Sequence, residues 1–124
     1  MKNMPFRVLL IDDAADHLAL CEYTLLQEGY SVASLPDCMQ LEQTLEKFNP
    51  QLIFIDHQMP GILGDEGIRL IRANPRFRSV PIIYFSSEVN LAALARSAGA
   101  DDFLAKPLDP VSLLKFAAKY RDCT

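Results

Sequence analysis

Four short, mostly apolar runs, each ending in a polar residue capable of chemistry, constrain this chain more than any other feature. The runs are residues 7–11, 52–55, 81–85 and 102–105, and they are followed by Asp12 and Asp13, Asp56, Ser86 and Ser87, and Lys106. Short apolar runs between longer segments are typical of strands buried in a sheet. A charge that stops such a strand is expected at the edge of the sheet.

The segments between these runs follow a helical period, so strands and helices are predicted to alternate five times. We expect strands at about 6–11, 30–34, 52–55, 81–85 and 102–104, and helices at about 14–28, 38–48, 65–73, 89–98 and 110–120. Asp37 and Asp109 are suited to cap the second and the last helix, and Gly29 and Gly99 to end the first and the fourth. This alternation predicts an α/β fold with a parallel sheet covered by helices on both faces. Ligands bind such sheets at the carboxyl ends of the strands, where the polar residues lie.

Length and composition exclude several classes of protein. The chain has 124 residues, which predicts one domain over 1–124, and a net charge of −4, which gives no sign of direct nucleic-acid binding. No apolar run is long enough to span a membrane, and the first residues do not resemble a signal peptide. Cys21, Cys38 and Cys123 are odd in number and widely spaced, which fits a reducing compartment. We therefore expect a cytoplasmic protein.

The strand-end residues have the chemistry of a site for a divalent cation and a phosphoryl group. Two carboxylates ~5 Å apart at an effective dielectric constant of ~20 repel by roughly 3 kcal/mol, and a cation relieves this repulsion. Asp12, Asp13 and Asp56 offer the oxygen ligands that Mg²⁺ prefers. Lys106 can pair with a phosphate oxygen, and the Ser86 hydroxyl can donate a hydrogen bond to another. Asp56 stands alone at its strand end, which makes it the candidate nucleophile.

These residues also carry a resemblance to a known family. The acid pair, the segment 56–64 (DHQMPGILG) and the segment 99–107 (GADDFLAKP) occur in order at the ends of the predicted strands. With this pattern the chain resembles, over essentially its whole length, the receiver domains of response regulators in bacterial two-component signalling. The resemblance implies a flavodoxin-like, doubly wound (βα)5 fold whose five parallel strands have the order 2-1-3-4-5.

The resemblance implies a role for each residue of the site. Asp56 would accept a phosphoryl group from a sensor histidine kinase or a phosphotransfer protein. Asp12, Asp13 and Asp56, together with the backbone carbonyl of Gln58, would hold Mg²⁺. Lys106 would contact the phosphate. The chain would thus act as a phosphoacceptor switch in a phosphorelay rather than as an enzyme.

A switch and an output face are implied as well. Ser86 stands where the family usually has Thr, and Phe103 would turn inward when Ser86 is drawn to the phosphate. The output face would consist of the fourth helix, the fifth strand and the last helix, where the apolar residues 91–95 suggest a surface for a downstream protein partner. A weak homodimer is left open. Pro107 would follow a cis peptide bond.

Two other functions remain open on the residues alone. A binding module that is never phosphorylated could use the same fold, and it would show no Mg²⁺ binding. A phosphatase with an aspartyl-phosphate intermediate commonly needs a second carboxylate two residues after the nucleophile, where this chain has Gln58. Taken singly, the motifs also have structural explanations: the acid pair could cap a helix, His17 could lie on a helix surface, His57 could be structural, and Cys21 could pack in the core.

Overall fold

The chain alternates strand and helix throughout the part that the structure describes. A computed structural model describes residues 4–57, 64–87, 90–106 and 109–123. The strands are β1 (Arg7–Ile11), β2 (Ser31–Leu35), β3 (Leu52–Asp56), β4 (Ile82–Ser86) and β5 (Asp102–Ala105). The helices are α1 (Ala15–Gln27), α2 (Leu41–Phe48), α3 (Gly64–Ala73), α4 (Leu91–Ala98) and α5 (Pro110–Arg121). Among these described helices, none combines the length and the apolar character needed to cross a membrane.

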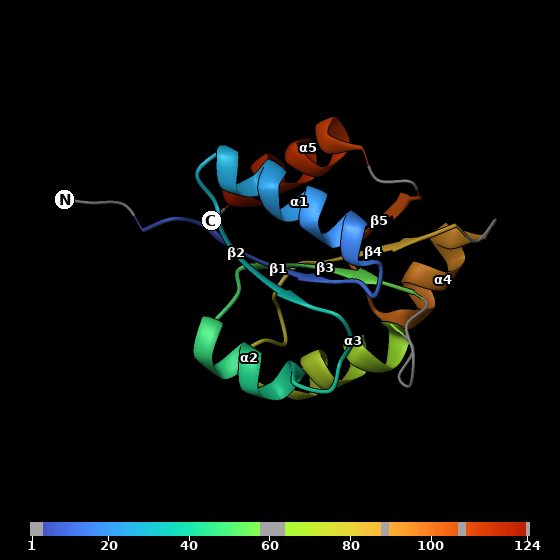
Figure 1. Cartoon of the computed structure of the whole chain (residues 1–124). Helices are drawn as coiled ribbons and strands as arrows, with labels where there is room; N and C mark the ends of the chain where they lie inside the picture. Colours follow the sequence, from blue (N-terminus) through green and yellow to red (C-terminus); the bar gives the residue numbers. More distant parts are fainter. Residues whose placement is uncertain (1–3, 58–63, 88–89, 107–108, 124) are drawn as a thin grey trace.

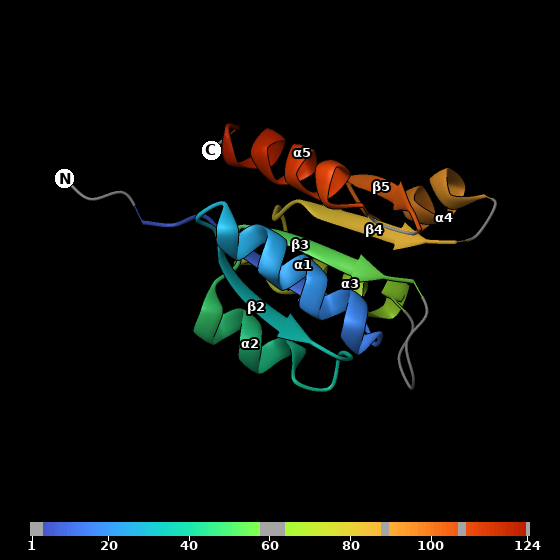
Figure 2. The ribbon, with the colours of Figure 1, turned by 45° about the horizontal axis from the view of Figure 1, so that its top comes forward.

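The strands form one parallel sheet in the order β2-β1-β3-β4-β5. Helices α1 and α5 cover one face of this sheet, and α2, α3 and α4 cover the other (Figure 1, Figure 2). The predicted α/β class and the strand order 2-1-3-4-5 are therefore confirmed. In this order the central strand β3 lies between β1 and β4, so the ends of these three strands meet at one edge.

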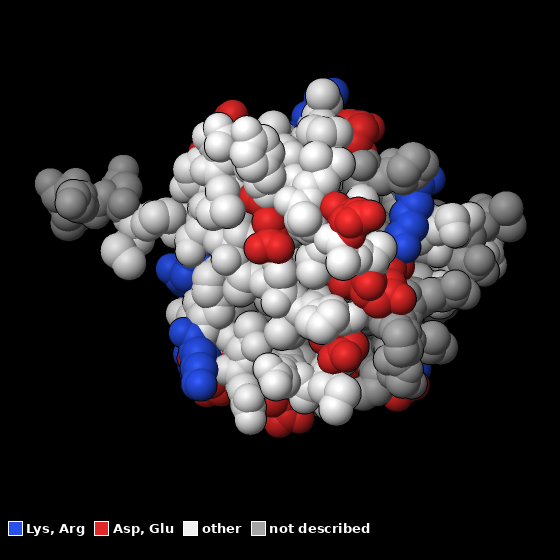
Figure 3. Space-filling model, viewed as in Figure 1, with Lys and Arg blue, Asp and Glu red and all other residues white. Residues whose placement is uncertain are grey.

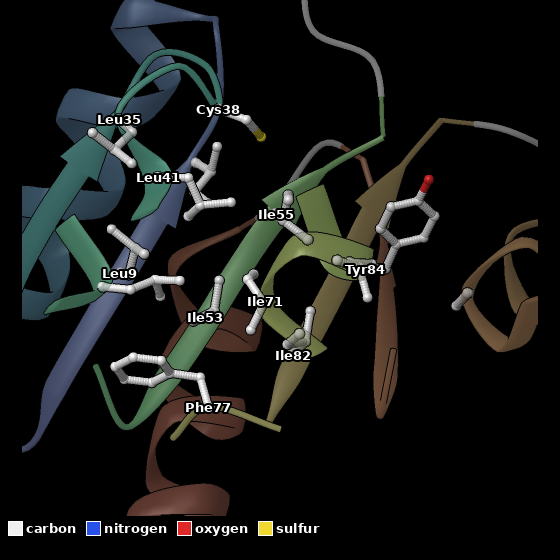
Figure 4. Close-up of a cluster of buried hydrophobic side chains, with 14 of the residues drawn as sticks. Leu9, Leu35, Cys38, Leu41, Ile53, Ile55, Ile71, Phe77, Ile82 and Tyr84 are labelled. Carbon is white, nitrogen blue, oxygen red and sulfur yellow. The ribbon is translucent and has the colours of Figure 1, made fainter. Parts of the chain in front are cut away.

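Two apolar clusters hold the helices on the sheet. The cluster beneath α2, α3 and α4 takes every second side chain of the strands, and Figure 4 labels ten of its members: Leu9, Leu35, Cys38, Leu41, Ile53, Ile55, Ile71, Phe77, Ile82 and Tyr84. The other cluster lies beneath α1 and α5 and takes the alternate side chains, among them Leu10, Phe54 and Phe85. Strands β3 and β4 are buried at every position, as the continuous apolar runs predicted, whereas the edge strand β5 is half-exposed.

Local signals set some of the helix ends. Asp109 caps α5, because its side chain accepts a hydrogen bond from the backbone N–H of Ser112 at 2.8 Å, and this bond lowers the pKa of Asp109. Gly99 ends α4 in a left-handed conformation with φ of 93°. The predicted start of the second helix was wrong. Asp37 accepts a hydrogen bond from the backbone N–H of Met39 in a turn, and α2 begins only at Leu41.

Candidate functional site

The register of the strands brings the predicted site residues to one edge of the sheet. Ile11 of β1 pairs with Ile55 of β3, so the residues that follow them, Asp12 and Asp56, lie level with each other. On the other side of β3, Asp56 pairs with Phe85. Ser86 follows Phe85 and pairs with Ala105, and Lys106 follows directly. The ladder continues here, since the backbone N–H of Lys106 donates to the Ser86 carbonyl at 3.0 Å.

Three carboxylates meet at this edge. One oxygen each from Asp12, Asp13 and Asp56 can be chosen so that all lie within 4.8 Å of one another. Asp12 and Asp56 are each 1% exposed, whereas Asp13 is exposed to solvent. Figure 3 shows acidic side chains gathered beside a basic one on the side of the molecule toward which the strands run in Figure 1. The buried acids need a partner of opposite charge, because an unpaired buried charge is costly.

Lys106 supplies that partner to Asp56. Its ammonium nitrogen lies 2.8 Å from Asp56 Oδ2, and the lysine side chain is 28% exposed. Burial nevertheless raises the pKa of Asp56 above its ordinary value; Lys106 acts in the opposite direction, and the neighbouring Asp12 adds to the rise. The ionised form of Asp56 is thus less favourable in the folded protein than in water. The site as a whole favours a further cation.

The mouth of the site is an open cavity of about 380 Å³, lined by Ala14, His17, Ser87 and Lys106. The Lys106 ammonium at this cavity lies 5.6 Å from the centre of the buried Phe85 ring. Ser86 is buried at the end of β4, the strand next to β3. A small anionic group entering the cavity would therefore meet the ammonium of Lys106, which lies 2.8 Å from Asp56 Oδ2.

Two residues near the acids were not assigned to the site by the sequence. His17 was expected on the surface of its helix; its side chain is 19% exposed, but its Nδ1 forms a hydrogen bond to Asp12 Oδ2 that the sequence did not predict. The spacing between the acid pair and His17 could have indicated this contact, because His17 lies in the first turn of the helix that follows the pair. His57 was expected to be structural or partly exposed; it is partly exposed, and its Nδ1 is hydrogen-bonded to the hydroxyl of the buried Tyr84. Cys21 packs in the core, as expected.

On the predicted output face, the residues that are exposed differ from those that the sequence led us to expect. Phe103 is 42% exposed, while Leu91 and Ala95 of α4 are buried in the core rather than available to a partner. Phe103 and the exposed Ala92 line a shallow cavity of about 170 Å³ between α4 and β5. The apolar content of α4 thus serves mainly to pack this helix on the sheet.

Two sequence-based predictions fall where the structure gives no description. The backbone carbonyl of Gln58 was expected to be a metal ligand, and Pro107 was expected to follow a cis bond. Both residues lie outside the described residues, so both expectations stay predictions.

Comparison with known proteins decides the family. The family model of the response regulator receiver domain matches residues 8–118. The chain belongs to the response regulator receiver domain family. A curated relative, an uncharacterized 14.6 kDa protein of Leptolyngbya boryana, is 32% identical over 116 residues, which cover 91% of this chain and 88% of the relative. The chain spans between 17% and 50% of the length of three other curated relatives that it matches.

Solved structures of receivers superpose closely on this one. The chemotaxis response regulator CheY4 of Vibrio cholerae matches with a TM-score of 0.87 at 25% identity, over 94% of this chain and 99% of that chain. The receiver domain of the sensor histidine kinase PA1611 from Pseudomonas aeruginosa PAO1 matches with a TM-score of 0.84 at 27% identity, over 94% of this chain and 98% of that chain. That structure has a magnesium ion coordinated in its active site cleft.

The donor set of this receiver suits the same kind of ion. Three carboxylates that converge within 4.8 Å are hard oxygen ligands, and Mg²⁺ in proteins is usually held by one or two carboxylates and several waters. The exposed position of Asp13 leaves room for those waters. The family also places the chain among the phosphoacceptors of two-component signalling rather than among catalytic enzymes.

Proposed function

We propose that this receiver is a phosphoacceptor switch, phosphorylated on Asp56 by a sensor histidine kinase or a phosphotransfer protein. The observation that carries the proposal is the arrangement around Asp56. This carboxylate is buried, has two further carboxylates within 4.8 Å, and has the Lys106 ammonium 2.8 Å from one of its oxygens. The site holds three carboxylates and one ammonium group. It therefore suits a reaction in which a metal cation and an anionic phosphoryl group bind together.

The proposed reaction is the transfer of a phosphoryl group to a carboxylate. An oxygen of Asp56 attacks the phosphorus of a phosphohistidine, an O–P bond forms, the P–N bond breaks, and the leaving imidazole takes a proton from solvent. Catalysis of such a transfer consists mostly of positioning and charge stabilisation. Lys106 is placed to pair with an oxygen of the transferred group, because its ammonium lies at the mouth of the site beside Asp56.

Asp12, Asp13 and Asp56 would hold Mg²⁺, with the backbone carbonyl of Gln58 as the further protein ligand that the family implies. When bound, Mg²⁺ would neutralise charge on the three carboxylates and on the incoming phosphoryl group. The coordinated magnesium ion in the PA1611 receiver supports this part of the proposal.

The phosphate would be sensed by Ser86 and read out through Phe103. Ser86 is buried at the end of β4, and Tyr84, two residues earlier on the same strand, pairs in register with Phe103 of β5. Phe103 is exposed beside α4, so an inward turn would change the surface that a downstream protein meets. The output face of the proposal is the surface of α4, β5 and α5.

Labelling with a small phosphodonor tests the reaction directly. Incubation of the whole chain with Mg²⁺ and phosphoramidate, which has the P–N bond of a phosphohistidine, should add the mass of one phosphoryl group in intact-mass spectrometry. A metal chelator should suppress the addition, because the cation would no longer offset the charge of the acids. A chain that stays unlabelled with Mg²⁺, or that is labelled equally with the chelator, would contradict the proposal.

The exposed acid of the cluster offers a separate test of the metal site. Asp13→Asn should leave the metal-free stability nearly unchanged, because Asp13 is exposed, but it should weaken Mg²⁺ binding by about tenfold or more. In the wild type, Mg²⁺ at 100 times its dissociation constant should add about 2.7 kcal/mol to the free energy of unfolding. Thermal unfolding at increasing Mg²⁺ measures both effects. Asp16→Asn, an exposed acid of α1 outside the cluster, is the matched control; equal Mg²⁺ responses of the two variants would exclude Asp13 as a ligand.

A further inference from the structure

His17 is fixed at the sheet edge from two sides, although it comes from a helix. Its Nδ1 is hydrogen-bonded to Asp12 Oδ2, and its ring packs edge-on against Phe85, with ring centres 5.9 Å apart and an interplanar angle of 62°. Phe85 is buried and pairs with Asp56 in the sheet, so it offers a rigid support. The imidazole therefore has one defined position relative to the buried carboxylate of Asp12.

The direction of this hydrogen bond follows from its partners. An ionised carboxylate only accepts hydrogen bonds, so Nδ1 of His17 donates and Asp12 Oδ2 accepts. At the other ring nitrogen, the Sγ atom of Cys21 lies 3.9 Å from Nε2. Burial raises the pKa of the Cys21 thiol to about 11, so the thiol keeps its proton and can donate weakly to Nε2. Both contacts agree with an imidazole that carries its hydrogen on Nδ1.

Asp12 is thereby oriented through both of its oxygens. Oδ1 accepts the backbone N–H of Ala14 at 3.0 Å, and Oδ2 accepts the hydrogen bond from His17. Each carboxylate oxygen has a second lone pair, so these bonds fix the carboxylate plane without using up its capacity to bind a cation. Within the described residues, the cluster of mutually close ligand atoms contains Asp12, Asp13 and Asp56 but does not contain His17. The contact through which His17 is placed to act on a bound ion is therefore its hydrogen bond to Asp12.

We propose that His17 is a positioning residue that sets the affinity of the acidic cluster for a divalent cation by holding the Asp12 carboxylate in its ligating orientation. The inference rests on the proposed function, because it assumes that the cluster binds Mg²⁺. Groups that orient a metal ligand from behind typically change metal affinity by about 10- to 100-fold when they are removed. The exposed Asp13 has no comparable support among the described contacts, so Asp12 is the ligand whose geometry the fold controls.

Calorimetric titration of the metal-free whole chain with MgCl2 tests the role of His17. His17→Leu removes the donor and should weaken Mg²⁺ binding by about tenfold or more. His17→Asn places an amide N–H close to the position of Nδ1, so it should restore the affinity to within about threefold of the wild type. Gln27→Leu introduces the same apolar side chain at an exposed position at the other end of α1, and it should bind as the wild type does.

The outcomes separate this inference from the proposed function. Equal or tighter Mg²⁺ binding by His17→Leu, with wild-type binding intact, would overturn the role of His17 alone. Equally weak binding by the leucine and asparagine variants would also overturn it, because the hydrogen bond would then not be the cause. A wild type without Mg²⁺ affinity would overturn the proposed function itself. If His17→Leu fails to fold, His17→Gln replaces it, because its amide reaches toward the position of Nε2 and away from Asp12, and the same tenfold loss is expected.

Discussion

Asp56→Asn is expected to abolish phosphoryl labelling and, at the same time, to stabilise the metal-free protein. The carboxamide of asparagine is too weak a nucleophile to attack phosphorus, so intact-mass spectrometry after incubation with Mg²⁺ and phosphoramidate should show only the unmodified variant. Reactivity is lost while stability is gained, because the carboxylate that reacts also destabilises the folded protein when it is buried and ionised. A buried nucleophile among other acids is retained for chemistry and not for stability.

The gain in stability follows from the surroundings of Asp56. The side chain is 1% exposed, and burial is the main cause that raises its pKa, with Lys106 acting against the rise and Asp12 adding to it. Asparagine is nearly isosteric, carries no charge, and leaves Lys106 free to reach toward solvent. The variant loses the ion pair with Lys106, but it also loses the repulsion between the carboxylates of Asp56 and Asp12. On balance we expect a gain of about 1–3 kcal/mol in the free energy of unfolding.

The pH dependence of this gain identifies its origin. Above the folded-state pKa of Asp56, the wild type bears the full cost of ionising a buried carboxyl group. Below the ordinary value of 3.8, Asp56 is neutral in both the folded and the unfolded state, and that cost is absent. The stability difference between variant and wild type should therefore shrink as the pH is lowered from neutral toward 4. Thermal unfolding with a metal chelator measures it; a variant less stable than the wild type at neutral pH would show that the Lys106 pair outweighs the repulsion.

The acids of the site could be predicted from the sequence because a short-range pattern decides their position. An apolar run that ends in a charge fixes where that charge lies along a strand, and parallel neighbours then bring Asp12 and Asp56 to the same edge. The order of the strands is a different matter. It depends on how the crossover helices pack, and here it followed from the resemblance to a family rather than from the pattern of apolar residues.

Two interpretations that the structure changed, apart from the start of α2, concern the direction in which helical side chains point. His17 and the apolar residues of α4 are close in sequence to predicted features, but their surroundings depend on the rotation of each helix on the sheet. His17 turns to Asp12, and Leu91 and Ala95 turn to the core. A broad stripe of apolar residues in a short helix does not fix this rotation to within one residue. Contacts across the sheet decide it, and they have no local signal.

Gly64→Ala is expected to destabilise the protein by about 3 kcal/mol or more, which corresponds to a fall of roughly 10 °C in melting temperature for a domain of this size. Gly64 begins α3, and its backbone N–H donates to the His57 carbonyl at 2.9 Å. A Cβ atom at this position would lie 2.2 Å from the carbonyl oxygen of Asp56 and 2.9 Å from Cε1 of Tyr84. The first of these atoms belongs to the backbone of the central strand, which is buried at every position and cannot yield.

Gly67→Ala is the matched control, because it adds the same methyl group one turn later in the same helix. The new Cβ would lie 2.8 Å from Cys38 Sγ and 2.8 Å from Ile55 Cδ1, which are side-chain ends rather than backbone atoms. Alanine is also favoured over glycine inside a helix by about 1 kcal/mol, so we expect this variant to stay within about 1 kcal/mol of the wild type. Chemical denaturation of the two variants side by side measures the difference. Equal stability of Gly64→Ala and Gly67→Ala would mean that the backbone of Asp56 can move away from the added methyl group. The close contact between Gly64 and Asp56 would then not hold the phosphoacceptor rigidly in place.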